Sequence, residues 1–181
     1  MWFDEEKAVA AFRTGNGVAW GDHDDRLYCG VSAFYRNAYS ASLVKEWLPA
    51  LTGVTAKLEA GAEVADVGCG YGRSLGKLQQ RFAPKRLIGM DIDPEMLEAS
   101  AAEVAGLGIA AEFVCCSSSN IKLPDNSVDL LFCHQTFHHL VEQDEALREF
   151  MRVLKPGGIL VVADWISGTI ARFHSMVGKS R

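Results

Sequence analysis

A sharp change in the pattern of apolar residues near residue 60 constrains the fold of this chain more than any other feature. After Gly61, short apolar runs alternate with helical patterns of roughly 10–15 residues. Strands that are apolar on both faces and separated by helices are typical of a parallel sheet covered on both sides. We therefore predict an α/β fold for residues 61–181, with a mostly parallel sheet of about five strands and a helical segment before it at residues 1–60.

The boundaries of the predicted elements follow from apolar spacing and from turn residues. Asp93 is the expected N-cap of a helix that begins at Pro94, because an Asp cap followed by Pro is a helix-start signal. The predicted strands are 63–67, 86–91, 110–115, 128–133 and 159–163, and the other helices are 72–82 and 142–154. In the first 60 residues, helices are expected at 5–13 and 31–48, with a polar loop between them and Pro49 closing the second.

Composition excludes several classes of protein. The 181 residues suit one domain, and 18 basic against 23 acidic residues give a net charge of −5, which argues against a nucleic-acid partner. The N-terminus is acidic and lacks a secretion signal, and the apolar run 159–166 is too short to cross a bilayer. Five cysteines without a CxxC pair indicate neither a disulfide framework nor a zinc site. We therefore expect a cytoplasmic protein that does not bind a membrane.

A glycine-rich loop follows the first predicted strand, where ligands of open parallel sheets bind. Its sequence from Asp66 to Gly72 is DVGCGYG, so the glycines follow a GxGxG spacing. A dinucleotide fingerprint needs a third glycine three positions after the second, and that position is Arg73 here. Asp91 ends the next strand about 20 residues later, a distance at which an acid can accept hydrogen bonds from a ribose. The loop therefore favours a nucleoside ligand other than a nicotinamide dinucleotide.

Asp66 restricts the class of nucleoside ligand further. An acid at the end of the first strand would repel a pyrophosphate but would attract an ammonium group. S-adenosylmethionine combines an adenosine with a charged amino acid, so Asp66 would face its amino group and Asp91 its ribose. An incidental glycine turn with two aspartates is the structural alternative.

Four motifs in order resemble the class I S-adenosylmethionine-dependent methyltransferases over about residues 63–164. They are VADVGCGYG at 64–72, IGMDI at 88–92, LPDNSVD at 123–129 and RVLKPGG at 152–158. The last two look like the small-molecule branch that includes ubiquinone and menaquinone biosynthesis enzymes. The resemblance implies a Rossmann-like fold, S-adenosylmethionine as cofactor, and methyl transfer to a small molecule.

The resemblance also implies roles for individual residues at the cofactor site. The residues expected to contact the cofactor are Asp66, Gly68, Cys69 and Gly70 at the methionine part, Asp91 at the ribose, Ile92, Ser117 and Ser118 at the adenine, and His134 near the sulfonium. Many relatives carry an acid after the third strand for the adenine amino group, where this chain has Cys116-Ser117-Ser118. Backbone groups or a serine hydroxyl would have to replace that contact.

Histidines after the fourth strand are the candidate catalytic residues. Methyl transfer needs a base only if the nucleophile must lose a proton, and histidine is the usual side chain for that task. We predict His134 and His138 as catalytic candidates and expect His139 to pack the loop. A metal site formed by these three histidines is a third hypothesis, but no acid or cysteine is clearly placed in the sequence as a further ligand, so no metal is expected.

The N-terminal 60 residues are predicted to form a lid. Their aromatic residues would shield the cofactor or bind an apolar substrate, with ordinary helix packing as the alternative. These aromatic residues are Trp20, Tyr28, Phe34, Tyr35, Tyr39 and Trp47. His23 lies between Asp22 and Asp24, which suggests either a carboxylate-supported base or a solvated loop.

Two function classes remain open for this chain. One is a small-molecule methyltransferase, and the other is a cofactor-binding but catalytically incomplete fragment or interaction module.

The complete family sheet has seven strands, but only 15 residues follow Ile166. We therefore expect the last two strands to be lacking and the fifth strand to be an exposed edge. Either residues 167–181 or a second subunit, forming a homodimer, would cover that edge.

Overall fold

The computed structural model describes residues 2–18, 22–164 and 172–177, and the chain divides into two compact units, Met1–Ser42 and Leu43–Arg181. The first unit contains a 3₁₀ turn, Trp2–Asp4, and two helices, α1 at Glu5–Thr14 and α2 at Asp25–Ser42. The predicted helix at 5–13 is confirmed, and it ends because Gly15 adopts a left-handed φ of 77° and donates its N–H to Ala11 O. Trp20, a predicted lid residue, lies outside the described residues.

Helix α2 begins earlier than the apolar spacing predicted. The Asp24 carboxylate accepts the backbone N–H of Arg26 at 3.0 Å, which satisfies a donor in the first turn of the helix. The second unit opens with a π turn at Leu43–Trp47 and two short helices, α3 at Leu48–Ala50 and α4 at Val54–Glu59. Pro49 was expected to close the long helix, but it lies in the first turn of α3, where its missing N–H costs nothing.

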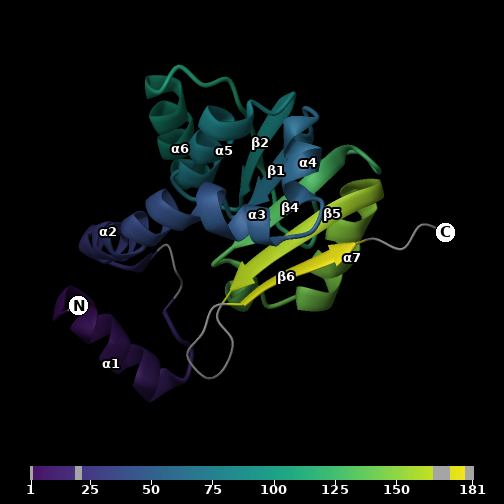
Figure 1. The fold of residues 1–181 in the computed structure, drawn as a ribbon. Coiled ribbons are helices and arrows are strands. Elements are labelled where there is room, and N and C mark those ends of the chain that lie inside the picture. Colours follow the sequence, from purple (N-terminus) through teal and green to yellow (C-terminus); the bar gives the residue numbers. More distant parts are fainter. Residues whose placement is uncertain (1, 19–21, 165–171, 178–181) are drawn as a thin grey trace. The chain divides into compact units, whose positions relative to one another are not determined.

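The second unit is built on one six-stranded sheet with the order β3-β2-β1-β4-β5-β6 (Figure 1). Its strands are β1 Glu63–Val67, β2 Arg86–Asp91, β3 Glu112–Cys115, β4 Val128–His134, β5 Leu154–Asp164 and β6 Arg172–Val177. The first five strands pair in parallel, as predicted. β1 and β2 begin and end at the predicted residues.

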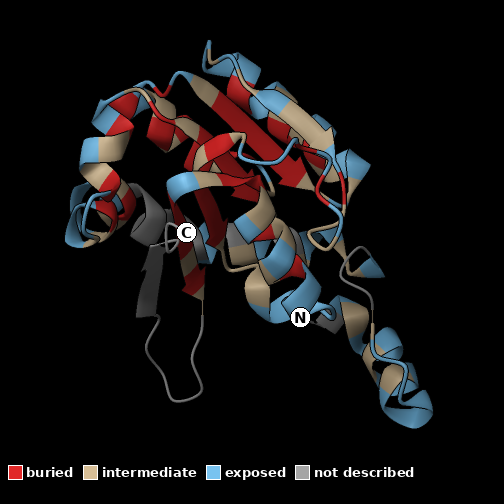
Figure 2. Cartoon of the chain, turned by 90° about the vertical axis from the view of Figure 1, so that its right-hand side faces the viewer, coloured by how far each residue is buried: buried red, intermediate tan, exposed pale blue. Residues whose placement is uncertain are grey.

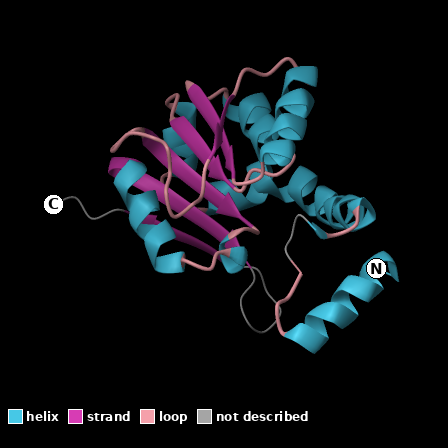
Figure 3. Ribbon diagram, turned by 180° about the vertical axis from the view of Figure 1, so that it is seen from behind, coloured by secondary structure: helices cyan, strands magenta, loops and turns pink. Residues whose placement is uncertain are grey.

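Helices cover both faces of this sheet (Figure 3). They are α5 at Arg73–Phe82, α6 at Pro94–Gly106 and α7 at Gln143–Val153, with a 3₁₀ turn at Phe137–His139. Asp93 caps α6 as predicted, because its carboxylate accepts the N–H groups of Glu95 and Met96. On β2, Ile88 belongs to the core cluster that α7 joins, whereas Gly89 faces Leu75 of α5. Successive strand residues point to opposite faces, so α5 and α7 lie on opposite sides of the sheet.

The hydrophobic core lies along the central strands, which Figure 2 shows as buried. Phe150 of α7 is fully buried and packs with Leu131 of β4 and Leu160 of β5 in one cluster. The long buried runs predicted from the sequence are thus the strands of a doubly covered sheet.

The expectation that the fifth strand is an exposed edge is wrong. β6 pairs antiparallel with β5, from Ile159 opposite Val177 to Asp164 opposite Arg172. The C-terminal residues therefore cover β5 within the same chain, which is the first of the two ways that were foreseen. A second subunit is not needed to satisfy the backbone groups of β5.

Candidate active site

The carboxyl end of β1 is the switch point of the sheet. The chain proceeds from β1 to β2 and β3 on one side, and then returns to place β4 on the other side of β1. The loops that leave β1 and β4 therefore run in opposite directions, and open parallel sheets bind their ligands at such a position. The predicted glycine loop and the predicted histidine loop are these two segments.

The backbone of the glycine loop is held against β2. The N–H groups of Gly68 and Cys69 both donate to Met90 O, at 2.8 Å and 3.0 Å. Gly68 and Gly70 have left-handed φ values of 68° and 52°, a region that residues with a Cβ enter at a cost. A Cβ on Gly68 would lie 2.3 Å from Thr136 Oγ1, whereas a Cβ on Gly70 would meet nothing within 4 Å. Gly68 therefore accommodates a neighbouring loop, and the space beside Gly70 is open.

Two carboxylates flank the glycine loop. Asp66 is 2% exposed at the end of β1 and accepts a hydrogen bond from Ser74 Oγ on α5. Asp91, at the end of β2, accepts the N–H of Gly70 at 3.1 Å and the N–H of Asp93 at 3.2 Å. The structure thus brings together the two acids that the sequence singled out, and it connects Asp91 directly to the loop.

Loss of hydration raises the pKa of both carboxyl groups. The pKa of Asp66 is raised to about 7, mainly by desolvation; the Ser74 hydrogen bond opposes the shift, and the neighbouring Asp91 charge adds to it. Desolvation also raises the pKa of Asp91, although backbone N–H groups lower it in part. A cation that approached Asp66 would recover the cost of its buried charge, which suits an ammonium group.

The residues predicted for the adenine lie beyond the end of β2 and β3. Ile92 is a large apolar side chain and is 71% exposed, although it directly follows the half-buried Asp91. Ser117 and Ser118 are half-buried, and the Ser117 hydroxyl pairs with that of Ser119 at 2.8 Å. The Cys116 N–H donates to Asp91 O at 3.0 Å, which ties this loop to the end of β2. Cys69 is buried, and desolvation raises the pKa of its thiol, so it is suited to packing rather than reaction.

His134 ends β4 and is held between two aromatic rings. Its ring stacks on Trp47 and on Phe132, with 6.0 Å between ring centroids in each pair. Burial lowers the pKa of His134 to about 4, and the charge of Asp164 opposes the shift. The ring of His134 is therefore neutral at ordinary pH.

His138 contacts a carboxylate that the sequence analysis did not identify. Its Nδ1–H donates to Asp164 Oδ1 at 2.5 Å, and its backbone N–H donates to Asp164 Oδ2 at 2.9 Å. His139 packs its ring on that of His138, 3.9 Å between centroids, in agreement with its expected packing role. The three histidines lie on a strand end and a 3₁₀ turn rather than on a helix, and no metal-binding cluster occurs among the described residues.

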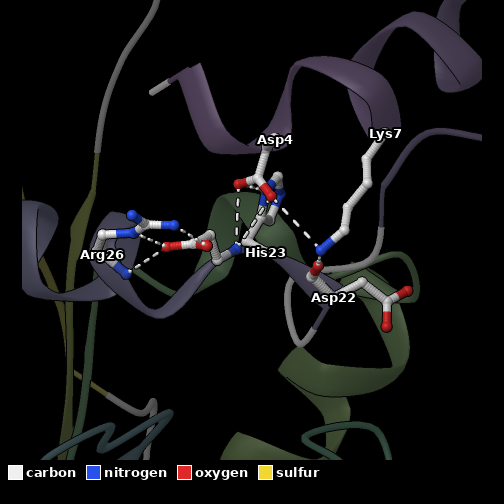
Figure 4. Close-up of polar contacts among 6 residues, drawn as sticks. Asp4, Lys7, Asp22, His23 and Arg26 are labelled. Atoms are coloured by element: carbon white, nitrogen blue, oxygen red, sulfur yellow. Dashed lines mark hydrogen bonds and ion pairs between the residues drawn. The ribbon is translucent and has the colours of Figure 1, made fainter.

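His23 belongs to the first unit and has a different partner from the expected ones. Its Nδ1 contacts Asp4 Oδ2 at 3.0 Å, and the same carboxylate accepts the Asp24 N–H at 3.1 Å (Figure 4). Asp4, which the sequence analysis did not single out, thus supplies a carboxylate that contacts His23. The contact joins the start of the chain to the segment before α2.

Three residues of the site were missed by sequence reasoning. Ser74 and Thr136 are small polar residues without a distinctive pattern around them, and they become visible only through their contacts with Asp66 and Gly68. Asp164 offered one signal, because it is an acid at the end of an otherwise apolar strand. An acid at that edge of a parallel sheet is a site candidate in the same way as Asp66 and Asp91.

Comparison with known proteins agrees with this geometry. Residues 65–162 match the family described as "Methyltransferase domain". The chain is 30% identical over 146 residues to the 2-methyl-6-phytyl-1,4-hydroquinone methyltransferase of Synechocystis sp., covering 81% of this chain and 45% of that protein. It is 32% identical over 115 residues to the ubiquinone/menaquinone biosynthesis C-methyltransferase of Hahella chejuensis, covering 62% and 46% respectively.

A solved structure gives the same result for the fold. A SAM-dependent methyltransferase from Aquifex aeolicus is 36% identical with a TM-score of 0.55, covering 58% of this chain and 57% of that one. The chain spans about half the length of the curated relatives described above. Within the described residues, no helix is long and apolar enough to span a membrane.

Proposed function

We propose that this chain, which belongs to the methyltransferase domain family, binds S-adenosylmethionine and transfers its methyl group to a small molecule. One observation carries the proposal: two carboxylates, the buried Asp66 and the half-buried Asp91, flank the open backbone position Gly70 at the switch point of the sheet. The relatives are small-molecule methyltransferases, and two of them are named for quinone or hydroquinone methylation. We extend this substrate class to the present chain.

The residues present fit the cofactor. Asp66 would hold the ammonium group, which offsets the cost of its buried charge, and Asp91 would accept hydrogen bonds from the ribose. The open space beside Gly70 leaves room for the ligand against the backbone of Gly68 and Cys69. The exposed face of Ile92 would pack on the adenine, with Ser117 and Ser118 at its edge.

The bound cofactor supplies an electrophilic methyl group on a sulfonium. The protein then has to orient the acceptor in line and exclude water, and positioning of this kind supplies much of the rate. His134 would present its neutral ring near the sulfonium, since burial and stacking hold it there. We propose that His134 and His138 are the side chains nearest to the reaction, and that the N-terminal segment acts as the lid.

We also place the protein in the cytoplasm and assign it no nucleic-acid partner. All five cysteines are free thiols, which suits a reducing compartment, and the net charge is negative. A homodimer is a further proposal, although β6 removes the edge of β5 as the reason for one.

Calorimetric titration with S-adenosylmethionine and S-adenosylhomocysteine tests the cofactor site. The wild-type chain should bind both ligands, and Asp91→Ala should weaken both at least tenfold because a ribose contact is lost. Asp93→Ala is the matched control, because it removes an acid two residues away that caps α6, and it should leave affinity within about twofold. Absence of binding to the wild-type chain at millimolar ligand would refute the proposal.

Transfer of a labelled methyl group separates the two function classes. A chain that binds the cofactor and methylates a hydroquinone, phenol, amine or thiol is an enzyme. Binding without transfer to any of these acceptors would favour the catalytically incomplete module.

A further inference from the structure

A histidine–carboxylate pair lies at the same edge of the sheet as the cofactor site, outside the residues that would hold the cofactor. Asp164 ends β5 and its side chain is 12% exposed, while the His138 side chain is 37% exposed. Both oxygens of the carboxylate are engaged, one by the ring Nδ1–H of His138 and the other by its backbone N–H. Two hydrogen bonds to one residue hold the ring in a defined orientation.

The loop that carries His138 packs directly on the glycine loop. Thr136 Oγ1 donates to His134 O at 3.0 Å and lies 3.4 Å from Gly68 O. The Gln135 N–H donates to Ala163 O at 2.8 Å, next to Asp164 in β5. These contacts attach the loop both to the glycine loop and to the strand that supplies the carboxylate, so the pair lies beside the proposed cofactor site.

The chemistry of the pair is that of a proton acceptor. Donation from Nδ1 to the carboxylate fixes the tautomer of the ring, so its Nε2 carries the lone pair. Asp164 also stabilises the imidazolium that forms when Nε2 takes a proton. The His134 ring instead stacks on Trp47 and on Phe132. His139 contributes its ring to the packing of His138.

We propose that His138 is the general base of the reaction, that Asp164 positions it, and that the methyl acceptor is a hydroxyl group of the phenol or enol type. The inference rests on the proposed methyl transfer. The hydroxyl proton moves to Nε2 of His138, a new bond forms between the acceptor and the methyl carbon, and the carbon–sulfur bond breaks with its electron pair on sulfur. An amine acceptor with a free lone pair would need no base in the bond-forming step.

Two acceptors that differ in acidity test the inference. At about pH 8, hydroquinone keeps its protons, whereas 4-nitrocatechol has already lost one and needs no base. With hydroquinone, kcat of His138→Gln should fall about 100-fold or more and that of Asp164→Asn about tenfold, within the usual range for general-base catalysis. With 4-nitrocatechol, both variants should lose less than about fivefold. Glu98→Gln, which removes an exposed acid on α6, is the control and should stay within about threefold of wild type on both acceptors.

Each other outcome has a defined meaning. Equal losses on the two acceptors would show that His138 only shapes the loop, and this would overturn the inference. A protein that binds S-adenosylmethionine but methylates neither hydroxyl acceptor would overturn it as well, while the cofactor site stands. Failure to bind the cofactor would instead refute the proposed function itself, and calorimetry on the same samples distinguishes these cases.

Discussion

Replacing Asp66 by Asn should make the ligand-free protein more stable at alkaline pH and should weaken its binding of the cofactor. Asp66 is 2% exposed, and burial raises its pKa from 3.8 to about 7. Asn keeps the size of the side chain and an oxygen that accepts from Ser74 Oγ, but it carries no charge to bury. The variant therefore removes the free-energy cost of burying an ionised carboxylate and changes little else.

The sign and size of the effect follow from proton linkage. The pKa of Asp66 is higher in the folded than in the unfolded protein, so the protonated side chain contributes stability below about pH 4. That contribution is lost as the pH rises through about 7. The shift of about three units corresponds to ~4 kcal/mol once the folded carboxyl has ionised. Between about pH 4.5 and 8, the advantage of Asp66→Asn over wild type should therefore grow by about 3 kcal/mol.

Guanidinium unfolding followed by circular dichroism at both pH values measures this difference. Glu98→Gln, which removes an exposed acid on α6, is the control and should show a pH-independent difference within about 0.5 kcal/mol. At about pH 8, excess S-adenosylmethionine should stabilise wild type more than Asp66→Asn, because its ammonium group compensates the Asp66 charge. The reasoning would be refuted if the two proteins differed by the same amount at both pH values.

Three further predictions test the packing around the site. Gly68→Ala should destabilise the fold by about 2 kcal/mol or more, since its Cβ would lie 2.3 Å from Thr136 Oγ1; a melting temperature equal to wild type would contradict this contact. Gly70→Ala should cost only about 1–2 kcal/mol of left-handed strain, but it should weaken S-adenosylmethionine binding at least tenfold in calorimetry, and unchanged affinity would place the ligand elsewhere. Phe150→Ala should lower the free energy of unfolding by about 3–5 kcal/mol in urea, because a fully buried ring of the main cluster is lost; a loss under 1 kcal/mol would mean that α7 packs loosely on the sheet.

Local sequence determined the elements whose boundaries depend on neighbouring residues. β1 and β2 have the predicted ends, because a buried parallel strand is a continuous apolar run that stops at turn residues. The start of α6 is encoded in two residues, Asp93 and Pro94, that act within one turn. The positions of Asp66 and Asp91 in the sequence predicted that the two acids lie together beside the glycine loop, since carboxyl ends of adjacent parallel strands meet at one edge.

Tertiary structure decided the features that join residues far apart in the chain. The pairing of β6 with β5 depends on inter-strand hydrogen bonds, and a short strand near the end of the chain has no local signal for its partner. The contact of Thr136 with Gly68 and that of Asp164 with His138 depend on the register of β4 against β1 and β5. The raised pKa of Asp66 needs the complete burial that only the assembled sheet and α5 provide. Residue order along the chain sets local conformation, but the distances between side chains on different strands, and therefore the chemistry of the site, are set by how the strands pack.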